Sequence, residues 1–129
     1  MYHYRAELIR VVDGDTVDLR VDMGFRLTTV QRFRLLGYDA PEMHGATREM
    51  GERAQAALAG LLGYWGEAAE IEIATEKGDS FGRWLCRITI TGGIDVAQYL
   101  IDLGYGRPWD GKGKRPAWNP NAVYPKSRA

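Results

Sequence analysis

Hydrophobic and polar residues alternate along the first third of the chain, which is the pattern of half-buried β-strands. The alternation predicts one strand over residues 4–12 and a second over residues 16–22, joined by the turn sequence Asp13-Gly14. A third strand is predicted over residues 25–36, after another glycine turn. Three consecutive strands with short connections predict a meander.

After residue 47 the apolar residues recur every three or four positions, and charged residues fill the other side. This spacing predicts an amphipathic helix. Thr47 is a candidate N-cap for that helix, because its hydroxyl could accept a bond from a free backbone N–H. The residues on the predicted apolar side are Met50, Ala54, Ala57, Leu58, Leu61, Leu62 and Trp65.

Alternation returns over residues 69–73 and 84–90, with a turn at 77–79 between them, and predicts two more strands. Asp95 and Gln98 have the spacing of a capping box, which predicts a short second helix. The order of three strands, a helix, two strands and a helix matches an OB-type barrel. We therefore predict a β-dominated α+β fold, a five-stranded OB-type barrel with about two helices.

Composition is that of one globular domain, since 45% of the 129 residues are hydrophobic and 26% are charged. We expect an OB-type domain over residues 1–110 and an irregular basic arm over residues 111–129, where the periodicity ends. No apolar run approaches the roughly 20 residues of a membrane-spanning helix, and the missing signal-peptide pattern favours the cytoplasm. Cys86 is the only cysteine, so an intramolecular disulfide is excluded.

Charge is balanced overall but not along the chain. Seventeen basic residues match seventeen acidic ones, so bulk positive potential gives no support for non-specific nucleic-acid binding. From Leu103 onward, however, Asp110 is the single acidic residue. Both a solvated tail and a polyanion contact fit this pattern. The basic residues of this stretch are Arg107, Lys112, Lys114, Arg115, Lys126 and Arg128.

The first motif whose residues could bind a ligand or take part in catalysis is DGDT at residues 13–16. Asp15 is in phase with Val17 and Leu19 of the predicted second strand, so its carboxylate lies at the edge of the core. A charge in that position needs a partner. Taken alone, the motif also fits an ordinary hairpin turn, which favours Asp-Gly.

The second motif is RLLGYDAPE at residues 34–42, where the third strand leaves the sheet through a proline turn. A charged loop with an exposed ion pair is the simple interpretation. If Asp15 and Asp39 come from adjacent strand ends, with a backbone carbonyl nearby, their oxygens would suit a hard cation such as calcium.

The third motif is DSFGR at residues 79–83. Arg83 lies opposite the apolar face of the strand over residues 84–90, so it need not enter the core. An ordinary surface arginine fits this position. The planar guanidinium would equally suit bidentate contacts with a phosphate, which a lysine cannot reproduce.

In this order, DGDT, RLLGYDAPE, DSFGRWL and LGYGRP resemble the staphylococcal nuclease (thermonuclease-like) family over residues 5 to about 110. The resemblance implies a metal-dependent phosphodiesterase on an OB-type barrel. Its cofactor would be Ca²⁺, its substrate DNA or RNA, and its products would carry a 3′-phosphate. We expect a monomer that has no membrane partner.

The resemblance also implies a role for individual residues. Asp15 and Asp39 match the family's metal carboxylates, with the main-chain oxygen of Ala40 beside them and Asp13 supporting the metal's waters. Such an ion suits the reaction, because a phosphodiester is anionic and gains charge in the transition state.

The remaining roles fall on three side chains. Arg34 and Arg83 match the arginines that hold the scissile phosphate, and Glu42 matches the carboxylate that acts as general base or orients water. Water must be aligned or deprotonated for hydrolysis, which needs a carboxylate near the ion that is not itself a ligand.

The chain departs from the family at several positions. Ser80 and Phe81 stand where a lysine and a tyrosine are common, so a hydroxyl contact near a terminal phosphate is missing. We expect Tyr105 and Trp109 to cover core rather than stack on a base. His44 has no partner at ligand spacing, and we assign it no chemistry.

Two other classes of function remain open from the sequence. One is a catalytically silent OB module that binds nucleic acid or protein, and the other is a metal-dependent hydrolase of small phosphodiesters. Salt distinguishes a polymer from a small substrate, because binding through several phosphates weakens steeply as salt rises.

Overall fold

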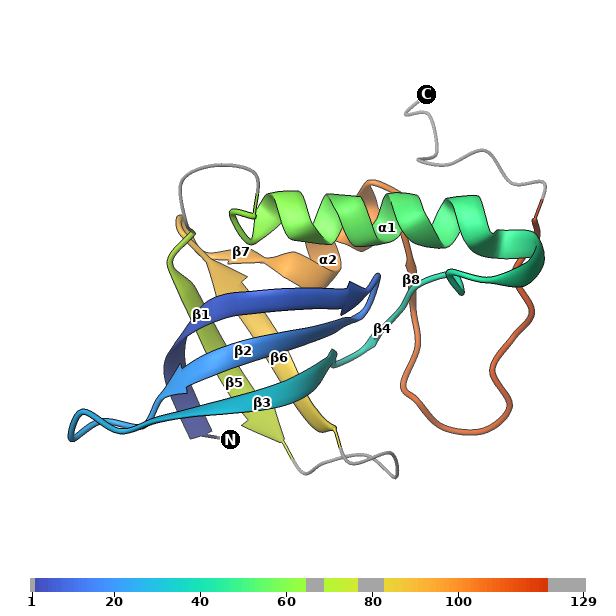
Figure 1. Cartoon of the computed structure of the whole chain (residues 1–129). Coiled ribbons are helices and arrows are strands. Elements are labelled where there is room, and N and C mark those ends of the chain that lie inside the picture. The colour runs from blue at the N-terminus through green and yellow to red at the C-terminus, as the bar shows by residue number, and fades with distance from the viewer. Residues whose placement is uncertain (1, 65–68, 77–82, 121–129) are drawn as a thin grey trace.

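The fold is a closed barrel, seen in a computed structural model that describes residues 2–64, 69–76 and 83–120 (Figure 1). Its main sheet has the strand order β3-β2-β1-β5-β6-β7. A parallel pairing between β3 and β6 closes five of these strands into the barrel and leaves β7 outside it. The strands are β1 (Tyr2–Asp13), β2 (Thr16–Asp22), β3 (Thr28–Leu35), β5 (Ile71–Glu76), β6 (Trp84–Ile90) and β7 (Ile94–Asp95).

Helices cover the barrel from outside. A short 3-10 turn, η1 (Gly45–Thr47), leads into α1 (Arg48–Leu61), which packs against β1 (Figure 1). The second helix, α2 (Val96–Asp102), packs against β6. The predicted order of three strands, a helix, two strands and a helix is confirmed, and with it the β-dominated OB-type barrel.

Two short strands lie outside the predicted pattern. β4 (Tyr38–Asp39) and β8 (Arg107–Pro108) pair antiparallel and form a separate sheet. Two residues are too few to show a period of two, so the sequence pattern gives no sign of either strand. Their pairing is important for the site, because it places Arg107 opposite Asp39.

The predicted third strand begins too early. Phe25 and Arg26 have φ values of 53° and 62°, in the left-handed region that side chains other than glycine rarely adopt. They belong to the hairpin turn between β2 and β3, where the Leu27 N–H donates to the Gly24 carbonyl at 2.9 Å. The strand over residues 25–36 therefore shortens to Thr28–Leu35.

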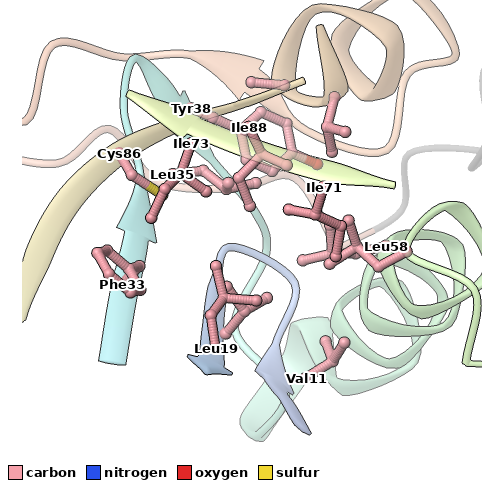
Figure 2. Close-up of a cluster of buried hydrophobic side chains, with 14 of the residues drawn as sticks. Val11, Leu19, Phe33, Leu35, Tyr38, Leu58, Ile71, Ile73, Cys86 and Ile88 are labelled. Atoms are coloured by element: carbon pink, nitrogen blue, oxygen red, sulfur yellow. The ribbon is translucent and has the colours of Figure 1, made fainter. Parts of the chain in front are cut away.

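The hydrophobic core fills the barrel and the space beneath the helices (Figure 2). Alternate residues of each strand point inward, as the period of two requires. Cys86 lies among them, and burial raises the pKa of its thiol to about 12, so it stays protonated and unreactive. The labelled core residues in Figure 2 are Val11, Leu19, Phe33, Leu35, Tyr38, Leu58, Ile71, Ile73, Cys86 and Ile88.

One of the two predicted helix caps is present in the structure and the other is not. The Asp95 side chain accepts a hydrogen bond from the Gln98 N–H at 3.1 Å, as the capping box predicts. Thr47 precedes α1 but makes no side-chain cap, because its hydroxyl donates to the Glu42 carbonyl at 2.9 Å.

Some predicted features lie outside the described residues. These are the turn at 77–79 and the residues Trp65, Asp79, Ser80, Phe81, Gly82, Lys126 and Arg128. Within the described part of the chain, no helix is long and apolar enough to cross a membrane.

Candidate active site

Five of the six predicted site residues line one cleft of about 800 Å³ at the side of the barrel. They come from the turn before β2, from β3, from the chain after β4 and from the residue before β6. The sixth, Asp39, lies fully buried beside them. The five that line the cleft are Asp15, Arg34, Ala40, Glu42 and Arg83.

Hydrogen bonds fix the carboxylate of Asp15 between two motifs that are 25 residues apart. Its backbone N–H donates to Asp13 Oδ1 at 3.1 Å, which forms the turn before β2. Its own Oδ2 accepts the Ala40 N–H at 3.1 Å, and its Oδ1 accepts the Thr16 hydroxyl at 3.1 Å. These bonds hold the carboxylate in one orientation, facing the second motif.

Gly14 allows this close approach of the two motifs. A Cβ at position 14 would lie 2.6 Å from the Cβ of Ala40 and 2.9 Å from the Cβ of Ala54 on α1. Both distances are shorter than a carbon–carbon contact permits. The glycine of DGDT is therefore required by packing against Ala40 and α1.

Asp39 is buried and surrounded by arginines. Its Oδ1 lies 3.4 Å from Arg34 Nη2 and 2.7 Å from Arg115 Nη2. Its Oδ2 accepts from Arg107 Nε at 3.0 Å. A buried carboxylate without such partners would be costly, so the three guanidinium groups make burial of this charge possible.

Arg34 joins the two aspartates. Its Nη2 lies 3.7 Å from Asp15 Oδ2, as well as near Asp39 Oδ1. The Trp109 ring covers the same guanidinium, with 5.0 Å from the guanidinium carbon to the ring centroid. The backbone N–H of Trp109 donates to the Gly37 carbonyl at 3.2 Å, which anchors that residue at the cleft. The two aspartates therefore face the same point.

Tyr105 lies at the core, as predicted, whereas Trp109 does not. Tyr105 packs against the hydrophobic core. Trp109 instead lines the cleft, because the pairing of β8 with β4 and the bond from its backbone N–H to Gly37 hold it there. The prediction that Trp109 covers core is therefore wrong.

Glu42 is positioned by the start of α1. A Cβ at Gly51 would lie 2.5 Å from the Glu42 carbonyl oxygen, so the chain passes directly over the helix at that glycine. The Thr47 hydroxyl bonds to the same carbonyl. The Glu42 side chain remains 46% exposed in the cleft, where water can reach it.

Two residues that sequence reasoning gave no role contact Glu42. Arg115 Nη1 donates to Glu42 Oε1, and His44 Nε2 lies 3.1 Å from Glu42 Oε2. His44 follows Glu42 by two positions, a spacing that carries no signal by itself. Arg115 follows it by 73 positions, so only the excess of basic residues late in the chain pointed to it.

The electrostatics of the site reflect the burial of charged side chains. Burial, and then the neighbouring Asp13 carboxylate, raise the pKa of Asp15 from 3.8 to about 6, although Arg34 opposes the shift. Burial would lower the pKa of Arg115, but the hydrogen bonds and charges of Asp39 and Glu42 together outweigh it, and the pKa is raised. The positive charge around Asp15 is thus too small to offset the cost of burying its ionised carboxylate.

The donor set suits a hard cation. Within residues 2–64, 69–76 and 83–120, no three His, Cys, Asp or Glu side chains gather closely enough to hold a metal on their own. The predicted set has two carboxylates and the Ala40 carbonyl, all oxygen donors of the kind that calcium prefers. Asp39 Oδ1 and the Ala40 oxygen already converge on one cationic atom, Arg115 Nη2.

Comparisons with known proteins agree with the motifs. A segment of 82 residues is 37% identical to micrococcal nuclease of Shigella flexneri and covers 64% of this chain and 40% of that protein. A segment of 110 residues is 29% identical to endonuclease YhcR of Bacillus subtilis strain 168, over 79% of this chain and 9% of the relative.

A shorter segment of 58 residues is 45% identical to protein ParB of Escherichia coli, over 45% of this chain and 28% of ParB. No family model matches the chain. The chain spans less than half the length of each of these relatives. The two relatives named as nucleases support a staphylococcal nuclease-like family for this chain, which confirms the resemblance predicted from its motifs.

Proposed function

We propose that this chain is a nuclease that hydrolyses phosphodiester bonds in DNA or RNA with the help of a divalent metal ion. The observation that carries the proposal is the meeting of Asp15, Arg34, Glu42 and Arg83 in one cleft, with Asp39 buried beside them. A silent binding module would have no need of this combination. The relatives named micrococcal nuclease and endonuclease support the same activity.

The arginines of the cleft would hold the scissile phosphate. Arg34 is suited to this task because Asp15, Asp39 and Trp109 fix its guanidinium before any substrate arrives. Donors that are already oriented stabilise developing charge without a cost of reorganisation. Arg83, just before β6, lines the same cleft and would contact the phosphate from there.

Asp15, Asp39 and the Ala40 carbonyl would hold the metal ion, which supplies positive charge against the growing negative charge of the phosphoryl oxygens. Glu42 would orient or deprotonate the attacking water, since its carboxylate is in the cleft and partly exposed. The proposal includes three finer points: Ca²⁺ as the ion, endonucleolytic cleavage, and 3′-phosphate products. It also includes a monomer, with the nuclease domain over residues 1–110.

Digestion of single-stranded DNA and RNA in Ca²⁺, and in an excess of chelator, tests this proposal. We expect cleavage in Ca²⁺ and none in chelator, with new fragment ends that a 3′-phosphatase can modify. Glu42→Gln should reduce the rate by roughly 10²-fold or more, as expected for a lost acid–base group.

Glu52→Gln is the matched control. Glu52 is an exposed residue of α1 that pairs with Arg48 and does not line the cleft. Its substitution should leave the rate unchanged. Undiminished cleavage in chelator would contradict the metal requirement, and equal rates for the two variants would contradict the role of Glu42.

A further inference from the structure

The basic arm after β8 returns to the site through a short stretch, which we call the strap (residues 115–118). Figure 1 shows the chain after β8 looping out and coming back beside the start of α1. The strap contains no helix or strand, so its position depends on side-chain contacts with the barrel. Those contacts come mainly from Arg107 and Arg115.

Arg107 fastens the strap to the barrel. Its Nη2 donates to the Pro116 carbonyl, and its Nη1 donates to the Ala117 carbonyl at 3.3 Å. Its guanidinium carbon lies 3.9 Å from the centroid of the Trp118 ring. Because Arg107 also bonds to Asp39, the strap is held directly over the buried carboxylate.

Arg115 then fills the position that the proposed ion would need. Its Nη2 lies 2.7 Å from Asp39 Oδ1 and 2.5 Å from the Ala40 carbonyl oxygen. Calcium lies about 2.3–2.6 Å from its oxygen ligands, so an ion bound to both atoms would occupy nearly the same point. The other nitrogen, Nη1, donates a hydrogen bond to Oε1 of Glu42, the proposed base.

We propose that Arg115 is an internal counter-cation of the site, and that a divalent ion must displace it, and so loosen the strap, in order to bind. The inference rests on the metal site of the proposed function. It adds that a cation of the chain itself, Arg115, competes with the metal ion for that site. Two cations cannot share these oxygens at such distances, because they repel each other strongly in a partly buried site. Ion binding would therefore free Glu42 from Arg115 as well.

Calcium affinity measured by titration calorimetry tests the competition without reference to activity. Removing a competitor that occupies the site nine-tenths of the time tightens the apparent affinity roughly tenfold. We expect this gain for Arg115→Ala. Trp118→Ala, which loosens the strap but keeps Arg115, should give a smaller gain. Lys114→Ala is the control, because the exposed Lys114 is next to Arg115 but makes no contact with the carboxylates.

Loosening of the strap can be measured separately from calcium affinity. The indole N–H of Trp118, assigned by nuclear magnetic resonance with a Trp118→Phe variant, should shift as Ca²⁺ is added to the wild-type chain. The shift should saturate at the same Ca²⁺ concentration as the heat of binding. Thermal melts in chelator establish that each variant is folded.

Two results would overturn the inference while leaving the proposed function intact. One is a wild-type chain that binds Ca²⁺ and cleaves nucleic acid but gains no affinity from Arg115→Ala. The other is a Trp118 signal that does not move when Ca²⁺ binds. If neither the wild type nor Arg115→Ala binds Ca²⁺, both the displacement and the proposed calcium site are wrong.

Discussion

Asp15 combines a structural role with an unfavourable charge. Its carboxylate bonds to the Ala40 N–H and so joins the first two motifs. Burial and the nearby Asp13 nevertheless raise its pKa to about 6. Near neutral pH the folded chain thus carries an ionised group that would be more stable in the unfolded chain. Sites that bind cations commonly show this deficit of positive charge, because the ion supplies it.

The pH dependence of folding should reveal this group. Between about pH 4 and pH 6 the folded chain keeps the Asp15 proton that the unfolded chain has lost, so stability falls as pH rises through this window. The full loss is up to roughly 3 kcal/mol for a shift of about two units. Asp15→Asn should therefore be more stable than wild type at pH 7 by up to that amount, and equal to it near pH 4, in urea unfolding with chelator present.

Asp18 provides a comparison of opposite sign. Hydrogen bonds from Arg32 lower the pKa of Asp18, so its contribution is present above pH 4 and lost as pH falls. Arg32 is exposed and Asp18 is partly exposed, and Asp18→Asn should cost no more than about 1 kcal/mol at pH 7. If Asp15→Asn also proved less stable than wild type at pH 7, the Asp15 pKa would not be raised.

At the scale of the element, α1 carries the segment that presents Glu42. Gly51 lies directly under the Glu42 backbone, and no side chain fits between them. A helix interior ordinarily disfavours glycine, by about 1 kcal/mol relative to alanine. The helix therefore loses some intrinsic stability at this position, and the close crossing of the two segments requires it.

Gly51→Ala should move the Glu42 segment away from α1. The added methyl group overpacks the crossing, which costs about 1–3 kcal/mol. We expect a displaced Glu42 and a cleavage rate reduced roughly tenfold or more, because catalysis depends on position. Gly60→Ala is the control in the same helix: Gly60 is exposed, and its replacement should raise stability by about 0.4–1 kcal/mol. Equal rates for both variants would show that Gly51 does not position Glu42.

The elements that the sequence predicts are those whose periodicity extends over several residues. Trp84–Ile90 has the predicted bounds, and α1 and α2 differ from prediction only at their ends. β4 and β8 were missed because two-residue strands show no period. The start of β3 was wrong because Phe25 and Arg26 adopt a turn conformation that favours glycine.

The site residues also divide into those that a sequence pattern predicts and those that it does not. The motifs identified Asp15, Asp39, Glu42, Arg34 and Arg83, and the structure brings these residues together, although their roles remain a proposal. Arg107 belongs to the LGYGRP motif and to the basic stretch, and Arg115 to the basic stretch alone, but neither pattern predicts a role for them at the site. Their place at Asp39 depends on the pairing of β4 with β8 and on the docked strap, and neither leaves a local pattern in the sequence.

At the scale of the whole molecule, the barrel and the arm differ in how they are held. Every residue of the hydrophobic core, as far as the structure describes the chain, comes before residue 106. The arm from residue 111 to residue 120 contacts the barrel through polar and aromatic groups instead. Folding should therefore depend on residues 1–110, and control of the cleft on the arm.

A chain that ends at Asp110 should test this division. We expect it to unfold cooperatively, with a midpoint about 5–10 °C below that of the full chain, because Asp39 loses Arg115 but keeps Arg34 and Arg107. Circular dichroism through a thermal melt measures this. A shortened chain without a cooperative transition would show that the arm is part of the folding unit.

We propose that a phosphodiester binds and is cleaved in the cleft between the barrel and the arm. Arg83 and Arg32 both line this cleft, and Arg32, whose guanidinium bonds to Asp18 at 2.8 and 3.1 Å, has no role in the proposal. The cleavage rate of single-stranded DNA in saturating Ca²⁺ should therefore fall roughly 10²–10³-fold in Arg83→Ala, as for a lost preorganised donor, and stay near wild type in Arg32→Ala. Equal rates in the two variants, or no cleavage by the wild type, would contradict the account.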